Sequence, residues 1–382
     1  MTATAVVSVL QQLLPDFMGQ AFHDIDSIKA SSENEFDIAL RQHSPFVLET
    51  LDLPFRSPSK AGTGPFAPVG PNSPTELQAN DRYYLGRSII DRIVVSTYPT
   101  VRAAWAEMLR DHLDVLYDVG TDALDSLEGS NKISVFTYVR PYQYALIFNT
   151  RAGVFRPPQV RRALSQAVDR EALVREALNG HGVPSSGSVW PRHWAIEGTQ
   201  RSPNFDVAAA AAILAQRGLR FTCLVPPDYE RLALALKRQL QAVNVSMDVS
   251  EVPPDEIDRA MARGEFDAVL LDVLSGPSVF RLFRIWHSGE ATNPSGFSSP
   301  RVDAGLDEIR RAATDNAYRS GVAAFRAAMD EDPPAIFLAW SVRARAVSNR
   351  FVVPPAESGR DIMSTLRLWK PTNDARSQTS RN

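Results

Sequence analysis

The sequence predicts an α/β fold organised as two lobes. The chain has 382 residues, of which 44% are hydrophobic, which is generous for one domain and enough to build two cores. Between residues 206 and 273, segments of helical periodicity alternate with segments of strand periodicity, a pattern typical of parallel α/β units. A helix that leads into an apolar strand with two aspartates occurs at 101–119 and again at 255–273. Two lobes with similar cores would explain this repetition.

The first half of the chain contributes a few clear elements. Apolar residues from Val101 to His112 share a helical face and lead into a strand at 113–119. A helix is expected at 160–167, followed by a second at 170–178. Asp169 is placed to cap this second helix and Gly180 to close it.

The α/β alternation is clearest in the centre of the chain. Asp206 is placed to cap a helix that runs to Gln216, and Gly218 is placed to end it. The remaining elements expected in order are strands at 219–225, 245–249 and 266–273, with helices at 232–243 and 255–263 between them. Helices at 302–309 and 318–329 and a buried strand at 335–340 complete the pattern. Cys223 alternates with apolar neighbours, which favours a buried strand position over a reactive thiol.

Composition excludes several classes of protein. The 41 basic and 44 acidic residues nearly balance, so the chain lacks the basic footprint of a nucleic-acid-binding protein and any polybasic cluster for a membrane surface. No run approaches the roughly 20 apolar residues of a membrane span. Residues 1–14 have no positively charged start, since Lys29 is the first basic residue, so no export signal is visible.

The motifs of common catalytic and metal sites are absent from the sequence. It contains no His-Glu-x-x-His, Gly-x-Ser-x-Gly, P-loop or Cys-x-x-Cys motif, and no two of its six histidines have metal-ligand spacing on one helix. Gly62-Thr63-Gly64 starts like a phosphate loop, but Pro65 removes a backbone donor. We therefore expect a binding protein with no catalytic residues, no metal site and no cofactor. A hydrolase that uses clustered carboxylates remains an open alternative.

A series of short motifs resembles the family 5 extracellular solute-binding proteins, which serve importers of peptides and nickel, among others. The motifs in chain order are Gly62-Thr63-Gly64-Pro65-Phe66, Asn80 to Gly86, Asp91-Arg92-Ile93-Val94, Phe148-Asn149-Thr150, Val160 to Leu164, Ala167 to Arg170, Gly182-Val183-Pro184, Gly264-x-Phe266-Asp267, Asn293-x-x-Gly296-Phe297, Val302-Asp303 and Asp332 to Ala335. Their order, over residues 62–345, carries the resemblance.

The resemblance implies a bilobed, type II periplasmic-binding-protein-like fold with two α/β lobes joined by a hinge. The implied division is a remnant of an N-terminal subdomain at 1–61, lobe I at 62–152 with 347–372, lobe II at 153–346 and a disordered tail at 373–382. Hinge crossings are expected near 150–158 and 344–350. Compared with the family, the chain is expected to lack a signal peptide and the first part of lobe I.

The resemblance also implies a function. The chain is expected to be the substrate-binding component of an ABC importer, a monomer that captures a peptide or peptide-like solute between its lobes and delivers it to the permease. Its expected location is the periplasm or the cell exterior. A cytoplasmic remnant or sensor module without a transport role is the alternative. Peptide-binding relatives often carry an acidic residue soon after the Phe-Asp strand, whereas residues 274–280 contain no carboxylate here.

Five residues are candidates for contact with the solute. Trp286, in a polar loop predicted at 284–289, suits a pocket wall, and core packing is the competing interpretation. Tyr142 and Tyr144 precede the expected hinge, and core packing or an edge-strand position is the favoured interpretation over contact with the solute. Phe280 and Asn293 are further candidates on either side of this loop.

Overall fold

The chain divides into two compact units. The computed structural model describes residues 2–51, 62–70, 75–119, 130–196, 205–356 and 360–372. The larger unit comprises Met1–Leu53 and Pro141–Ser341, and the smaller unit comprises Pro54–Arg140 and Val342–Asn382. The divisions fall inside two long strands, β7 (Ile133–Phe148) and β12 (Ala335–Ser348).

These bounds differ from the sequence-based division mainly at the start of the chain. Met1–Leu53 groups with the larger unit, whereas the sequence suggested a separate subdomain at 1–61. The chain crosses between the units at 140/141 and 341/342, before each of the predicted crossings. Residues 52–61 and the tail predicted at 373–382 lie outside the described residues.

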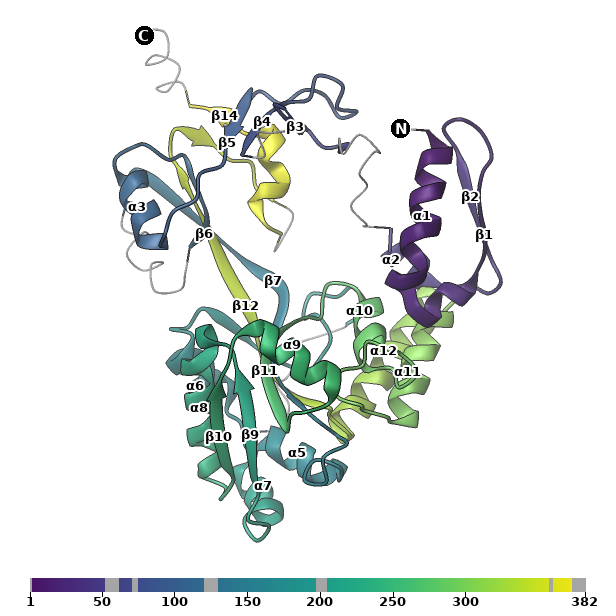
Figure 1. Cartoon of the computed structure of the whole chain (residues 1–382), viewed down its shortest axis with the longest axis vertical. Helices are drawn as coiled ribbons and strands as arrows, with labels where there is room; N and C mark the ends of the chain where they lie inside the picture. Colours follow the sequence, from purple (N-terminus) through teal and green to yellow (C-terminus); the bar gives the residue numbers. More distant parts are fainter. Residues whose placement is uncertain are drawn as a thin grey trace. The chain divides into compact units, whose positions relative to one another are not determined.

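The larger unit contains most of the helices (Figure 1). Its elements before β12, besides the end of β7, are α1 (Ala3–Met18), η1 (Gly19–Asp24), β1 (Ile25–Ala30), β2 (Phe36–Leu40), α2 (Pro45–Glu49), α5 (Pro158–Gln166), α6 (Arg170–Ala177), β8 (Gly182–Pro184), α7 (Val207–Leu214), β9 (Arg220–Val225), η2 (Pro227–Tyr229), α8 (Glu230–Gln241), β10 (Ser246–Glu251), α9 (Pro254–Arg263), β11 (Ala268–Leu274), α10 (Val279–Trp286), α11 (Pro300–Arg311) and α12 (Asp315–Glu331).

The central sheet of this unit confirms the α/β prediction. Its strand order is β10-β9-β11-β7-β12, and β8 pairs with β12. β10 and β11 both run parallel to β9, and β7 runs antiparallel to β11 with Leu146 opposite Leu270. The predicted helix caps also form, since the side chains of Asp169 and Asp206 accept hydrogen bonds from the first turns of α6 and α7.

One face of the sheet forms the main hydrophobic core. Alternate residues of β7, β9 and β11 point to this face and pack against α5, α6, α7 and α8. Cys223 of β9 is fully buried there, which confirms the strand position expected from the sequence, and burial raises the pKa of its thiol.

The N-terminal segment, defined as residues 2–51, packs on α10. β1 and β2 form an antiparallel hairpin, and the buried residues of α1 recur every three or four positions, as expected of an amphipathic helix. Phe17 of α1 and Phe46 of α2 lie with their ring centroids 5.5 and 5.6 Å from the ring of Phe280. Phe46 also contacts Phe283 at 5.4 Å. These aromatic pairs hold the segment against the helix.

The smaller unit has a more modest core. Its elements, besides the start of β7 and the end of β12, are β3 (Phe66–Pro68), β4 (Glu76–Ala79), β5 (Arg92–Val94), α3 (Val101–Leu109), β6 (Val115–Val119), β13 (Phe351–Val352), η3 (Ile362–Leu368) and β14 (Lys370–Pro371). β3, β4 and β5 form an antiparallel sheet, and β6 pairs with the end of β12.

Buried Arg345 pairs with Asp361 at 2.7 Å and lies 3.8 Å above the ring of Tyr117.

No helix in the described ranges is both long enough and apolar enough to cross a membrane.

Candidate functional site

A hollow of about 530 Å³ lies in the larger unit, between the N-terminal segment and the start of α12. We call it the aromatic hollow. One side is formed by residues of β2 and α2 with the loop between them, and the other by residues 312–315 with Tyr318 and Trp194. Its volume falls in the range of small-molecule sites, which are roughly 300–1,000 Å³.

Stacked rings form one wall of the aromatic hollow. The rings of Trp194 and Tyr318 lie 4.9 Å apart, and the ring of His193 stacks on Tyr318 at 5.7 Å. The guanidinium of Arg319 lies 5.2 Å from the ring of Trp194. Half of the Trp194 surface is exposed, while Tyr318 and His193 are buried beneath it. The wall therefore presents one large aromatic face, and its support is rigidly packed.

Glu49 joins the two sides of the aromatic hollow. One of its carboxylate oxygens accepts a 2.6 Å hydrogen bond from the Tyr318 hydroxyl. The other accepts bonds from the Ser278 hydroxyl and, at 3.0 Å, from the backbone N–H of Phe280, so Glu49 also caps α10. Burial and the nearby charge of Glu49 raise the pKa of Tyr318, so its phenol stays protonated and donates.

His193 is a neutral member of the wall. Burial lowers its pKa to about 4. Its Nδ1 accepts a hydrogen bond from the backbone N–H of Ala195 at 3.2 Å, which fixes the ring orientation. With exposed Asp315 and half-buried Glu49 in the lining, the aromatic hollow combines neutral rings with two carboxylates.

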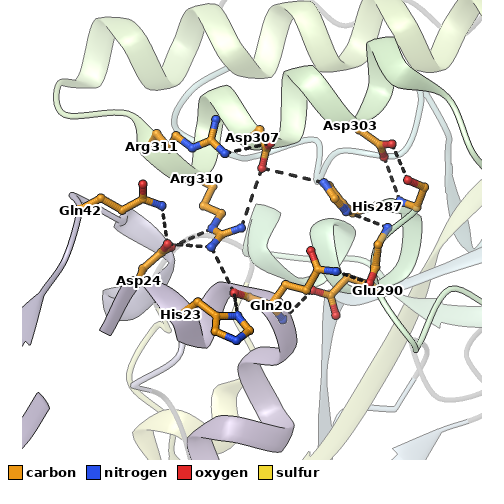
Figure 2. Close-up of polar contacts among 12 residues, drawn as sticks. Gln20, His23, Asp24, Gln42, His287, Glu290, Asp303, Asp307, Arg310 and Arg311 are labelled. Carbon is orange, nitrogen blue, oxygen red and sulfur yellow. Dashed lines mark hydrogen bonds and ion pairs between the residues drawn. The ribbon is translucent and has the colours of Figure 1, made fainter. Parts of the chain in front are cut away.

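A buried ion pair fixes the N-terminal side of the aromatic hollow (Figure 2). Arg310 of α11 donates to both carboxylate oxygens of Asp24, at 2.8 and 2.7 Å, and to the carbonyl of Gln20 at 3.1 Å. Burial alone would raise the pKa of Asp24, but hydrogen bonds from Arg310 and Gln42 and the charge of Arg310 hold it below its ordinary value.

A second ion pair supports the same junction. Glu290 pairs with Arg284, and its other oxygen accepts a 3.0 Å bond from the backbone N–H of Gln20. Arg284 also donates to the carbonyl of Asp16 at 3.0 Å. The N-terminal segment is thus held by charged groups as well as by aromatic packing, and the lining that it supplies is held in place.

Trp286 and Phe280 lie in α10, directly behind this region. The loop predicted at 284–289 is wrong at its start, because apolar residues at helical spacing extend α10 to Trp286. Trp286 is fully buried and packs edge-on against Phe337 at 5.8 Å. Phe280 is also buried, and only its backbone reaches the site, through the bond to Glu49.

The other three candidates lie elsewhere in the larger unit. Asn293 shapes its own turn, donating to the carbonyl of Phe297 at 2.7 Å. Tyr144 is buried against Tyr229, and its hydroxyl lies 3.4 Å from that of Ser341. Tyr142 is half-buried on β7, opposite Leu274 of β11. None of the five sequence candidates lines the aromatic hollow, and their contact with a solute stays a prediction.

The sequence offered weak signals for the residues that do line the aromatic hollow. Trp194 follows Trp190-Pro191 in a loop, where an aromatic side chain is available for binding. Tyr318 begins the helix predicted at 318–329, where its apolar spacing does not tell a pocket wall from the core. Glu49 gave no signal, because its partners lie 229 to 269 positions away.

Within the described part of the chain, no three His, Cys, Asp or Glu side chains gather in a group that could hold a metal ion.

Comparison with known proteins gives a consistent result. A family model described as bacterial extracellular solute-binding proteins, family 5 Middle, matches residues 15–292. Heme-binding protein A of Haemophilus influenzae is 26% identical over 196 residues, which are 51% of this chain and 34% of that protein. Oligopeptide-binding protein AppA of Bacillus subtilis is 20% identical over 319 residues, 77% of this chain and 59% of that protein. The chain thus spans roughly a third to three fifths of these relatives' lengths.

Solved structures show the same fold. NikZ from Campylobacter jejuni, in complex with Ni(L-His), superposes with a TM-score of 0.78 at 19% identity, covering 96% of this chain and 84% of that chain. NikA from Brucella suis, in complex with Fe(III)-EDTA, gives a TM-score of 0.82 at 16% identity, covering 97% of this chain and 85% of that chain. The periplasmic-binding-protein-like α/β fold expected from the sequence is therefore confirmed.

Proposed function

Because the chain belongs to the bacterial extracellular solute-binding proteins of family 5, we propose that it captures a small solute for import. The solute is a peptide or peptide-like compound, and the chain delivers it to the permease of an ABC transporter from the periplasmic or extracellular side. The names of an oligopeptide-binding relative and a dipeptide-binding relative from Escherichia coli support this class of solute. The chain acts as a binding protein, so the solute leaves unchanged.

The observation that carries this proposal is the aromatic hollow. A half-exposed Trp194, supported by buried rings, offers an apolar face for part of the solute. Glu49 on the opposite side and Asp315 on the same side as Trp194 make the rest of the lining acidic. A solute with an apolar side chain and an amino group is complementary to this combination. Such a group would lie in the field of these two carboxylates, although residues 274–280 contain none.

Transport also requires that capture be signalled to the permease. The sequence-based expectation that the lobes close over the solute stays a prediction. In that scheme the solute shifts the balance toward a closed form only by its higher affinity for that form.

The first experiment is thermal unfolding of the full chain with a panel of ligands. The panel contains dipeptides such as Met-Leu, a nonapeptide, the nickel–histidine complex and heme, taken from the relatives and their complexes. A solute at 100 times its dissociation constant adds about 2.7 kcal/mol of stability. We expect a dipeptide or longer peptide to raise the melting temperature, and mass spectrometry to recover it intact.

A matched pair of variants then locates the site. Trp194→Ala is expected to weaken solute binding about tenfold, because it removes the exposed aromatic face, while stability changes little. Phe205→Ala is the control, since Phe205 is equally half-exposed in the same unit but does not line the aromatic hollow. If both variants bind the solute like the unaltered chain, the aromatic hollow is not the site. If no panel member raises the melting temperature or binds in calorimetry, or if peptide is cleaved, the function is wrong.

A further inference from the structure

A second hollow in the larger unit shares no lining residue with the aromatic hollow. We call it the arginine hollow. It has a volume of about 230 Å³ and lies among α5, α12, the start of β12 and the loop that follows β8. Arg162 and Ser165 come from α5, Ser188 from the loop and Arg326 from α12.

Positive charge dominates the arginine hollow. Arg162 and Arg326 both line it, and Arg162 forms no ion pair with any residue that the structure describes. Asp330 is the one carboxylate among the described lining residues, and it interacts electrostatically with Arg326 and with Arg170. Two guanidinium groups therefore face one carboxylate.

A third guanidinium lies directly behind the lining. Arg170 is buried and donates to the Ser165 hydroxyl at 2.8 Å and to the carbonyl of Phe337 at 2.6 Å. Burial lowers its pKa to about 10, so it stays protonated at neutral pH. Its hydrogen-bond acceptors are neutral oxygens, and Asp330 is the carboxylate whose charge acts on it, so three guanidinium groups share one carboxylate at the arginine hollow.

The loop presents a buried hydroxyl that lacks a partner. Ser188 is almost fully buried, and its Oγ has no hydrogen-bond partner. The neighbouring Gly187 has a φ of +131°, which favours glycine. Gln143 fixes the loop by donating to the Ser185 hydroxyl at 2.7 Å and to the Gly187 carbonyl at 2.8 Å. A buried hydroxyl held without a partner at the edge of a cavity is a donor available to a ligand.

We propose that the arginine hollow binds a small ligand through an oxyanion group, a phosphate or a carboxylate. Arg162 and Arg326 supply charge-assisted hydrogen bonds, and the Ser188 hydroxyl donates to the same group. The volume, less than half that of the aromatic hollow, fits a small anion better than a peptide. This is a second binding function, separate from solute capture.

The test is calorimetry of the full chain with inorganic phosphate and with succinate, at constant ionic strength. Saturable binding of either anion is expected, and the anion that binds tells phosphate recognition from carboxylate recognition. Arg162→Ala is expected to weaken binding about tenfold. Arg175→Ala, which removes the same charge from an exposed position on α6 outside the lining, is expected to bind like the unaltered chain.

Ser188→Ala separates a ligand role from a structural one. Because the hydroxyl has no partner, the variant without anion is expected to keep or raise its melting temperature, while anion binding falls several-fold. Absence of saturable binding for both anions, or equal binding by all three variants, overturns the proposal. Solute binding at Trp194 is measured in parallel. It should persist in Arg162→Ala, so failure of this proposal is distinct from failure of the proposed function.

Discussion

The ion pair between Asp24 and Arg310 should decide whether the N-terminal segment stays docked. Arg310→Leu removes both donors to the Asp24 carboxylate, at 2.7 and 2.8 Å, and the bond to the carbonyl of Gln20. Asp24, only 1% exposed, then keeps its 2.5 Å bond from the neutral amide of Gln42 but loses its charged partner. Removing one partner of a buried pair costs about 3–5 kcal/mol, because the remaining charge is left uncompensated.

The pH dependence of this variant gives a second signature with a known sign. In the unaltered chain the pKa of Asp24 is held below the value of about 3.9 that an aspartate has in the unfolded chain. The ionised carboxylate therefore stabilises the fold fully above about pH 3.9, and this stabilisation is lost as the pH falls further. Without Arg310, burial is opposed only by the neutral donors Gln42 and Ser44, so the Asp24 pKa is expected to rise. The folded variant then binds a proton more readily than the unfolded chain, so its loss of stability should shrink as the pH falls from 7 toward 5.

The assay is urea unfolding followed by tryptophan fluorescence, with amide hydrogen exchange in residues 2–51 to detect local undocking. Arg311→Leu is the control, because Arg311 is exposed on the same helix and pairs with Asp307 at 3.1 Å. That pair should be worth less than about 1 kcal/mol. Equal losses for the two leucine variants, with unchanged exchange in residues 2–51, would refute the reasoning. So would a loss for Arg310→Leu that does not shrink at lower pH.

Three further predictions concern single side chains. Glu49→Gln should lower the free energy of urea unfolding by about 1–3 kcal/mol, because it replaces a carboxylate oxygen such as the one that accepts from the Ser278 hydroxyl and from the first turn of α10. A loss smaller than that of a Glu→Gln change at an exposed position would contradict this. Burial lowers the pKa of His193 to about 4, below the value of about 6.5 in the unfolded chain, so the free energy of unfolding should fall as the pH is lowered from 6.5 toward 4. His193→Phe should make the free energy of unfolding less dependent on pH across this range, as measured by urea unfolding. Arg345→Lys should destabilise the smaller unit by about 1–3 kcal/mol, seen as lower protection of β12 and η3 in hydrogen exchange, because lysine cannot reproduce the fork to Asp361; unchanged protection would count against it.

Local patterns explain why so much of the fold could be predicted. The caps at Asp169 and Asp206 and the left-handed Gly264 after α9 act within one turn, so the residues themselves report them. Alternation in β9 likewise reported which side of the strand is buried. The same kind of pattern occurs in α1, whose buried residues Val7, Leu10, Leu14 and Met18 recur every three or four positions.

The site was harder to predict, because an exposed aromatic and a buried one look alike in a sequence. Trp286 has polar neighbours and could belong to either class. It is buried because α10 extends as far as Trp286 and turns this side chain toward Phe337. Trp194 has a comparable sequence context but follows the turn at Pro191, and half of its surface stays exposed. Only the path of the backbone distinguishes the two.

Contacts between distant positions are the part that no local pattern could supply. Glu49 reaches Tyr318 across 269 positions, and Asp24 reaches Arg310 across 286. Both bonds join the N-terminal segment to α11 or α12, and the segment supplies one whole side of the aromatic hollow. The groups that dock the segment and the groups that shape the hollow are therefore parts of one structure. If the aromatic hollow is the solute site, anything that releases the segment also removes half of that site, and bound solute must in turn stabilise the docked segment by the same free energy.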